Sequence, residues 1–186
     1  MKMRNLILLL VGLAALTQAP PAAAQYTVTH DFLTAVEKND FAEARSNLFK
    51  GANVNGRKDG LPGLALALRN RNYDMMRFLI DNGALVNATT LGTNPQTTLM
   101  LAAVSGDGQG LALLLSARAD PNAIDRQGQT ALMKAAANRH AEAARVLIAG
   151  GADIFQTDYT GRTAMQHARE ARATGVIKLL EEAGYP

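Results

Sequence analysis

Two kinds of short apolar block alternate along most of the chain. The first kind is rich in small residues and begins with leucine or methionine, as in Leu132–Ala136. The second carries a pair of large aliphatic residues shortly before a glycine or alanine, as in Leu147-Ile148. Apolar residues within each block lie three or four positions apart, the spacing of one face of an α-helix. The pattern therefore predicts pairs of short helices.

The helix pairs repeat at a nearly constant interval. Four short segments that end the second block of a pair, Gly51–Asn55, Gly83–Asn87, Arg118–Asn122 and Gly151–Phe155, lie 32 to 35 residues apart. In the second helix expected over 141–149, the predicted inward residues are Ala144, Val146, Leu147 and Ile148. One such unit is too small to bury its apolar stripe alone, so the units are expected to stack.

Turn and capping residues stand at the expected ends of the helices. Asp125–Gly128 and Asp158–Gly161 are Asp-x-x-Gly turns that lead into Thr130 and Thr163, which are placed to cap the next helix. Asp59 is expected to brace its turn as Asp125 and Asp158 do. A Gly-Ala pair ends most second helices, because glycine tolerates the left-handed conformation of a C-cap.

These residues resemble the ankyrin repeat, whose pattern runs D-x-x-G-x-T-P-L-H-x-A-A, then G-H, then V-x-x-L-L-x-x-G-A-D-x-N. Residues 125–153 match it best, and the resemblance covers about 31–184. It implies an all-α repeat fold: an ankyrin solenoid of about five helix-turn-helix units joined by β-hairpin-like turns, with the first and last units abbreviated. The expected units are 31–55, 56–87, 88–122, 123–155 and 156–186, within a domain spanning 25–186.

The sequence departs from the ankyrin pattern at four places. Pro62 stands where a capping threonine is expected, and Asn87–Thr97 is longer than its counterpart Asn122–Thr130. Arg118 replaces the glycine of Gly-Ala, and Arg169 replaces the second alanine of the last unit, as suits a solvent-facing end.

The N-terminal segment has the three zones of a secretory signal. Lys2 and Arg4 precede the apolar run Leu6–Leu16, and small residues end at Ala24. The apolar run is about half as long as a membrane-spanning helix. We therefore expect residues 1–24 to be a cleaved signal peptide and the protein to be periplasmic or secreted, without stable membrane insertion after cleavage. The alternative is an uncleaved membrane anchor that makes the protein a membrane-attached scaffold.

Composition excludes several kinds of chemistry. The chain has no cysteine, so disulfides and thiolate sites are ruled out, and no serine stands in a G-x-S-x-G turn. The sequence around His140 lacks the zinc-binding H-E-x-x-H pattern, and the resemblance assigns this histidine to the scaffold. The glycines of Ser105–Gly110 follow a helix rather than a strand, so they are interpreted as a weakened helix start, with a hinge as the alternative. We expect no catalytic residues, no metal site and no cofactor.

The resemblance implies binding through the turn tips and the inner face of the first helices. Net charge is only +3 and falls to about +1 without Lys2 and Arg4, so nucleic acid is not an expected partner. The expected partner is a protein, possessing an acidic patch that the basic side chains meet, with Tyr159 as the anchor, and the chain is expected to be a monomer. The predicted partner-binding residues are Arg57, Lys58, Leu61, Arg69, Asn70, Arg126, Gln127, Gln129, Asn138, Tyr159, Thr160 and Arg162.

Three classes of function remain open at the level of sequence. The first is a non-enzymatic protein-binding module outside the cytosol. The second is an envelope chaperone or protective factor for periplasmic or membrane proteins, which needs an exposed apolar groove. The third is a carrier of small ligands or metals, which the missing ligand clusters disfavour.

Overall fold

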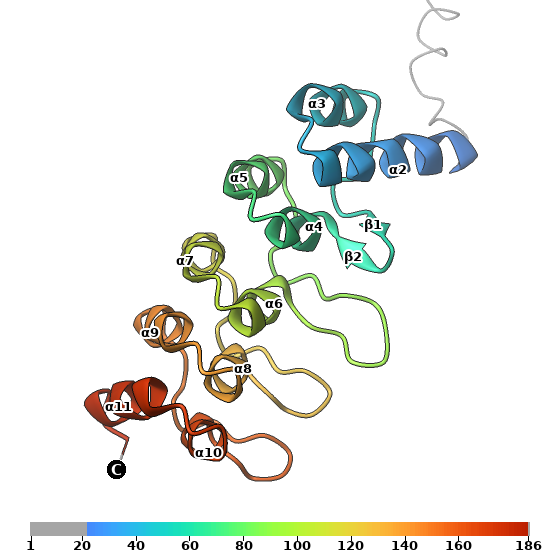
Figure 1. Cartoon of the computed structure of the whole chain (residues 1–186). Helices are drawn as coiled ribbons and strands as arrows, with labels where there is room; N and C mark the ends of the chain where they lie inside the picture. Colours follow the sequence, from blue (N-terminus) through green and yellow to red (C-terminus); the bar gives the residue numbers. More distant parts are fainter. Residues whose placement is uncertain (1–21, 186) are drawn as a thin grey trace, which may run out of the picture.

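A computed structural model describes residues 22–185 and consists of an elongated stack of helix pairs (Figure 1). The first helix of each pair lies in one row and the second in a parallel row, and the turns between pairs project to one side (Figure 1). The first helices are α2 (Ala22–Lys38), α4 (Gly63–Arg69), α6 (Thr98–Ser105), α8 (Ala131–Ala137) and α10 (Ala164–Glu170). The second helices are α3 (Phe41–Phe49), α5 (Tyr73–Asp81), α7 (Gly108–Ser116), α9 (Ala141–Ala149) and α11 (Thr174–Glu182). The all-α repeat architecture predicted from the sequence is confirmed.

The core runs continuously between the two rows. Small first-helix residues such as Ala135 and Ala136 are fully buried, which lets neighbouring helices approach closely. Leu114 of α7 and Leu147 of α9 are also fully buried, each against helices of its own pair and the adjoining ones. In α9 the inward face is Ala143, Ala144 and Leu147, whereas Val146 and Ile148 are only half-buried. Val146 and Ile148 nevertheless pack against the core, so the predicted stripe faces inward as expected, and Ala143 belongs to it as well.

The two predicted helix caps form. Thr130 accepts the backbone N–H of Met133, and Thr163 forms a capping box with Gln166. Thr97, at the matching position of the third unit, accepts the backbone N–H of Met100. Arg118 adopts the left-handed conformation, φ 64°, that Gly151 adopts at the matching position. Pro62 precedes α4 without any side-chain cap, as its substitution for threonine implies.

The first unit is longer than the sequence pattern suggested. Helix α2 begins at Ala22, upstream of the expected unit boundary at residue 31, and Phe32, Leu33 and Val36 on it are buried. It covers the open end of the stack in place of an abbreviated cap. Most of the predicted signal peptide, residues 1–21, lies outside the described residues, and Ala22–Ala24 form the first turn of α2.

The second unit has a true β-hairpin at its tip. Strands β1 (Arg57–Lys58) and β2 (Leu61–Pro62) pair antiparallel across Asp59-Gly60. Both turn residues have positive φ, 52° and 77°, as a two-residue hairpin of this kind requires. The expectation that Asp59 braces its turn was wrong: it occupies a left-handed position of the hairpin, and Arg57 stands where the fourth and fifth units carry the bracing aspartate.

The two glycines at the start of α7 have different roles. A Cβ on Gly110 would lie 2.7 Å from Leu68 Cδ1 and 2.9 Å from the capping carboxylate of Asp107. A Cβ on Gly108 would meet nothing closer than 3.4 Å. Gly110 therefore allows α7 to pack closely against α4, in addition to any weakening of the helix start.

We expect the two alanine exchanges to change stability in opposite directions. Gly110→Ala should lower the free energy of unfolding by about 1–3 kcal/mol through overpacking. Gly108→Ala should raise it by up to about 1 kcal/mol, because alanine favours the helix. Urea titration of both proteins measures the difference, and a stabilising Gly110→Ala would show that this glycine is not needed for packing.

Candidate functional site

Buried aspartates organise the tips of the last two turns. One carboxylate oxygen of Asp125 accepts backbone N–H bonds from Gln127 and Gln129, at 2.9 and 3.0 Å. Asp158 accepts the same pair from Thr160 and Arg162, at 2.9 and 3.0 Å. The predicted bracing role of these two aspartates is confirmed.

The second oxygen of each aspartate binds a buried cationic or ionisable side chain from the following first helix. Lys134 Nζ lies 2.7 Å from Asp125 Oδ2, with side-chain exposures of 8% and 0%. His167 Nε2 lies 2.9 Å from Asp158 Oδ2, and both side chains are buried. Lys134 and His167 occupy the same register position, four residues after the capping threonine. The turns are therefore fastened to the helices that follow them.

The hydrogen bonds at these aspartates shift their acidity. Burial alone would raise the pKa of Asp158, but hydrogen bonds from the Thr160 hydroxyl, the Arg162 amide and His167 outweigh it and hold the pKa well below its usual range. At Asp125 burial is likewise outweighed, by Lys134 and the amides of Gln129 and Gln127, so its pKa is also lowered. Both carboxyls bind protons more weakly when the protein is folded.

Stability should therefore decline in acid. The contribution of each aspartate is present above its ordinary pKa of 3.8 and is lost as the pH falls toward the lower pKa of the folded state. We expect the free energy of unfolding to fall steadily below about pH 5, and Asp158→Asn to make this decline shallower. Urea titrations at successive pH values measure the slope, with the exposed Asp81→Asn as the control. An acid slope that Asp158→Asn leaves unchanged would contradict the assignment.

The tips of successive units are bonded to one another. The amide of Leu91 donates to the Gly60 carbonyl at 2.8 Å, and the amide of Tyr159 donates to the Gln127 carbonyl at 3.0 Å. Between the third and fourth units the link is a side chain, since Arg126 donates to the Thr93 carbonyl at 2.8 Å. The tips therefore form one continuous row rather than separate fingers.

The longer turn of the third unit belongs to this row. Thr90 takes the place of the bracing aspartate, and its hydroxyl accepts the amide of Gln96 at 3.1 Å. Asn94 at the far side of the turn donates to Asp125 of the next tip at 3.3 Å. The extra residues thus contact both neighbours instead of bulging freely.

Two of the predicted basic residues share one acid on the first helix. Glu37 of α2 binds Lys58 Nζ at 2.5 Å and also forms an ion pair with Arg69. The hydrogen bond from Lys58 lowers the pKa of Glu37. Asn70 donates to the Glu37 carbonyl at 2.7 Å. Sequence reasoning missed Glu37 because it lies on another helix, 21 residues before Lys58.

The remaining basic tip residues differ in how much charge they leave available. Arg162 lies 3.5 Å from Asp158 and 3.2 Å from Glu170, so its charge is largely compensated. Arg57 and Arg126 bond only to backbone carbonyls, those of Thr89 and Thr93, and the structure records no acid partner for either within residues 22–185. Arg57 and Arg126 are therefore the basic tip residues with uncompensated charge.

The other predicted residues are either exposed on the tips or bonded and packed within the stack. Tyr159 is 71% exposed, with its ring lying along Gly128 of the preceding tip. Leu91, on the tip of the third unit in the same row, is 64% exposed. Gln129 accepts a hydrogen bond from the Lys134 side chain, and Asn138 donates to the Lys134 carbonyl. The Thr160 hydroxyl donates to Asp158, and the Gln127 carbonyl accepts from the Tyr159 amide. Leu61 is half-buried.

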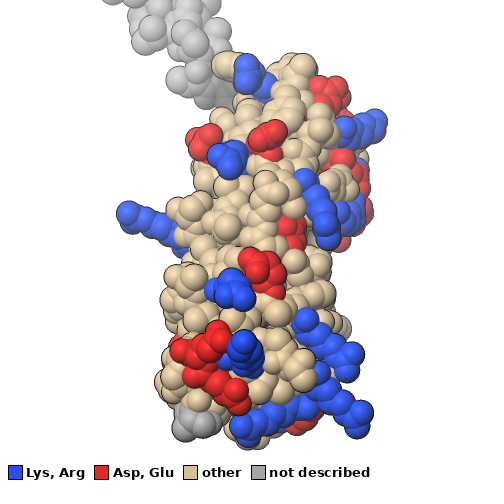
Figure 2. All heavy atoms as spheres, turned by 60° about the vertical axis from the view of Figure 1, so that its left-hand side comes forward, with Lys and Arg blue, Asp and Glu red and all other residues tan. Residues whose placement is uncertain are grey.

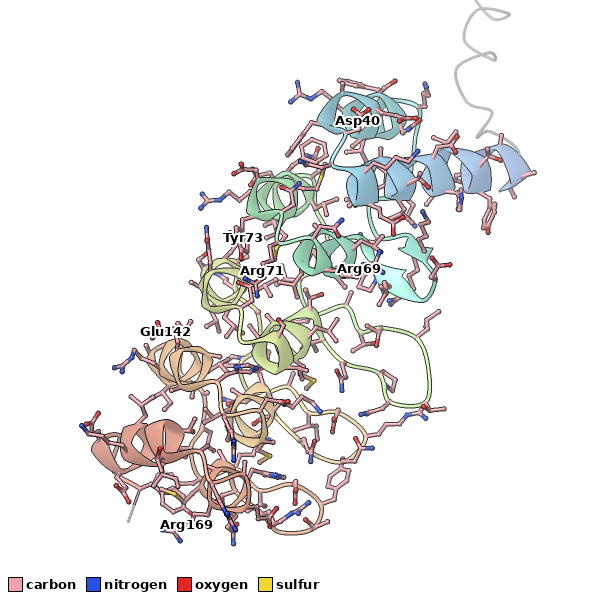
Figure 3. The ribbon with its side chains drawn as sticks, viewed as in Figure 1. Asp40, Arg69, Arg71, Tyr73, Glu142 and Arg169 are labelled. Atoms are coloured by element: carbon pink, nitrogen blue, oxygen red, sulfur yellow. The ribbon has the colours of Figure 1, made fainter. Side chains whose placement is uncertain are left out.

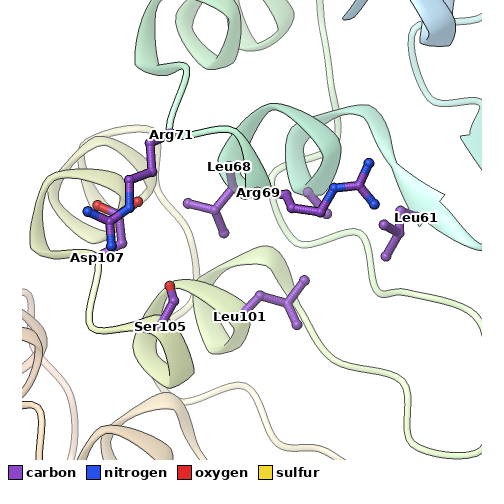
Figure 4. A pocket seen from close by; sticks show the side chains of 8 residues that line it. Leu61, Leu68, Arg69, Arg71, Leu101, Ser105 and Asp107 are labelled. Carbon is purple, nitrogen blue, oxygen red and sulfur yellow. The ribbon is translucent and has the colours of Figure 1, made fainter. Parts of the chain in front are cut away.

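A hollow opens between α4 and α6. Its volume is about 330 Å³, and its walls are mainly apolar, with Leu61, Ala65, Leu68 and Leu101 among them. Figure 4 shows Arg69 and Leu61 toward one end and Arg71 beside Asp107 at the other. Tyr73, labelled beside Arg71 in Figure 3, donates a hydrogen bond from its hydroxyl to Asp107 at 2.9 Å. The hollow therefore brings the predicted residues Leu61 and Arg69 together with residues that sequence reasoning did not connect to them.

The face formed by the second helices has a different character. Figure 2 shows acidic and basic side chains interspersed over most of it, whereas basic side chains gather along one edge at the C-terminal end of the stack. Among the described residues no group of three or more metal-binding side chains converges. Within residues 22–185 no helix combines the length and apolar character that crossing a membrane requires.

His140 is placed as the resemblance implied. Its Nε2 lies 3.0 Å from the Val104 carbonyl of the preceding unit, and its ring packs against Gly106, whose φ is 68°. This histidine therefore joins two units of the scaffold.

Comparison with known proteins agrees with this geometry. The family model described as ankyrin repeats (3 copies) matches residues 32–125 and 99–185, which together cover most of the chain. The chain belongs to the ankyrin repeat family. Such repeats are generally non-enzymatic scaffolds for protein–protein interaction. A search of curated proteins finds no match.

Proposed function

We propose that the chain is an exported binding module whose linked tips and inner helix face hold one partner protein. The observation that carries the proposal is the continuous tip row, in which backbone and side-chain bonds fix neighbouring tips to one another. A surface ordered before binding loses little conformational entropy when a partner docks, which favours affinity. Tyr159 and Leu91 supply exposed apolar contacts on this row.

The uncompensated charge on the tips favours a partner with an acidic patch. Arg57 and Arg126 lie on separate tips, and neither faces an acid partner within the described residues. Charges placed this way mainly raise the association rate and make it sensitive to salt. Lys58, Arg69 and Arg162 are already paired, so they act chiefly in holding the surface in shape.

Export rests on the sequence of the N-terminal segment. N-terminal sequencing of the protein from the envelope fraction of its source organism should begin at Gln25, and an intact Met1 would instead support the anchor. Cleavage after Ala24 would leave the buried residues of α2, which begin at Phe32, in place.

Affinity capture tests the binding role. Residues 25–186, immobilised and exposed to the extracytoplasmic fraction of the source organism, should retain one dominant protein in a fixed ratio. Many clients in variable amounts would favour the envelope chaperone. Capture of no protein would overturn the proposed function.

A further inference from the structure

The hollow between α4 and α6 arises from one residue of the repeat. Ala65 is the third residue of α4, and the same register position carries Met100 in α6 and Met133 in α8. Both methionines are buried to 1% exposure. Where the neighbouring units place a long side chain, the second unit has only a methyl group, and a space of about 330 Å³ opens there.

The shape and lining of this space suit one apolar side chain. It lies at the small end of the range for ligand pockets, and its walls come mainly from Leu61, Ala65, Leu68 and Leu101. Ser105 lines its rim (Figure 4), and the Ser105 hydroxyl is already bonded to the Ala102 carbonyl at 3.1 Å. A leucine or phenylalanine placed there would leave water without adding an unpaired polar group.

One end of the hollow carries an available cation. Arg71 lines the hollow and also a second, polar depression that includes Asn70, Arg77 and Asp74. Within residues 22–185 the structure records no ion pair of the Arg71 guanidinium. Asp107, the acid nearest to it in Figure 4, is 5% exposed and accepts bonds from Tyr73 and Gly110 through Oδ1, while its buried Oδ2 has no hydrogen-bond partner among the described residues and forms no ion pair with Arg71. The exposed side of Arg71 thus favours a carboxylate from outside the chain.

We propose that this hollow anchors an apolar side chain of the partner protein while Arg71 binds an acidic residue close to it in the same segment. The inference rests on the proposed function and names the recognition element within it: a segment with a leucine or phenylalanine near an aspartate or glutamate. Because Arg71 lies at one end of the hollow, a segment that also carries an acidic residue should bind more tightly than a segment with an apolar residue alone.

The probe is the blocked peptide acetyl-Gly-Phe-Gly-Glu-Gly-amide, titrated into ¹⁵N-labelled residues 25–186 at millimolar concentration. Saturable shifts are expected at the amides of Leu101 and Ser105. Versions with serine for phenylalanine or glutamine for glutamate should bind at least several-fold more weakly. Arg71→Gln should weaken the glutamate peptide by roughly tenfold and leave the glutamine peptide unchanged.

Filling the hollow should abolish binding without harming the stack. Ala65→Met introduces the residue of the neighbouring units, and its thermal midpoint should equal or exceed that of the parent protein. Ser105→Phe closes the rim in a second way. Ser116→Phe on α7 makes the same exchange outside the hollow, at an exposed serine whose hydroxyl likewise bonds to the carbonyl three residues before it.

We expect Ala65→Met and Ser105→Phe to lose peptide binding and Ser116→Phe to keep it. Binding that all three variants keep would overturn the role of the hollow, as would the absence of saturable shifts in the parent protein. Either failure would leave protein capture by the stack intact. Conversely, if the peptide binds but affinity capture retains no protein, the proposed function is overturned, while the hollow remains a site for an apolar side chain beside an acidic one.

Discussion

Leu147→Ala should lower the free energy of unfolding by about 2–5 kcal/mol. Leu147 is fully buried and lies on α9, which packs against α7 and α11 as well as its own partner α8. Truncation therefore opens a cavity that no single helix can close by moving. Such a loss is a large part of the stability of a typical domain.

Urea titration followed by circular dichroism measures this effect. Leu114→Ala on α7 is expected to cost a similar amount, because Leu114 is equally buried. Leu85→Ala is the matched control, since Leu85 is 63% exposed and should change stability by less than about 0.5 kcal/mol. A loss below about 0.5 kcal/mol for both Leu147→Ala and Leu114→Ala would contradict the stacking register.

Lys134→Ala should cost about 3–5 kcal/mol, because it leaves the carboxylate of Asp125 buried without its cation. In that variant Asp125 keeps its backbone amide donors and the long hydrogen bond from the Asn94 side chain but no cation, and the Asp125 side chain is 0% exposed. The turn would also lose its fastening to α8, so local order at the fourth tip should decrease as well.

The neighbouring unit supplies the conservative control. His167 pairs with Asp158 at the same register position, so Lys134→His should retain most of the stability at pH 6. A double-mutant cycle with Asp125→Asn then isolates the energy of the pair. If Lys134→Ala costs less than about 1 kcal/mol, the buried pair does not stabilise the turn as described.

The repeat architecture could be predicted because its determinants are local and periodic. The capping threonines, the Asp-x-x-Gly turns and the glycine C-caps each act within a few residues of themselves. Pro62 and Arg118 could be recognised as exceptions for the same reason. The upstream extension of α2 could not be predicted, because Ala22–Tyr26 carries no repeat signal and its residues are exposed.

The pairing of charges at the candidate site could not be predicted from the sequence, because it depends on contacts between units. Glu37 lies 21 residues before Lys58 and 32 before Arg69, and no local pattern pairs them. The prediction of a basic row therefore counted side chains that already pair with acids of the same chain. The hollow did leave a signal in the sequence, because Ala65 aligns with Met100 and Met133, and comparing the repeats position by position reveals the missing side chain.

Binding of the captured partner to charge-reversed variants tests the central claim, that the tip row and inner face form the recognition surface. Arg57→Glu combined with Arg126→Glu changes the tips, and Arg145→Glu combined with Lys178→Glu makes the same change of charge on α9 and α11. The first pair should slow association at least tenfold at low salt, while the second should bind as the parent protein does. Equal association rates and equal salt dependence for the two pairs would contradict recognition by the tip row.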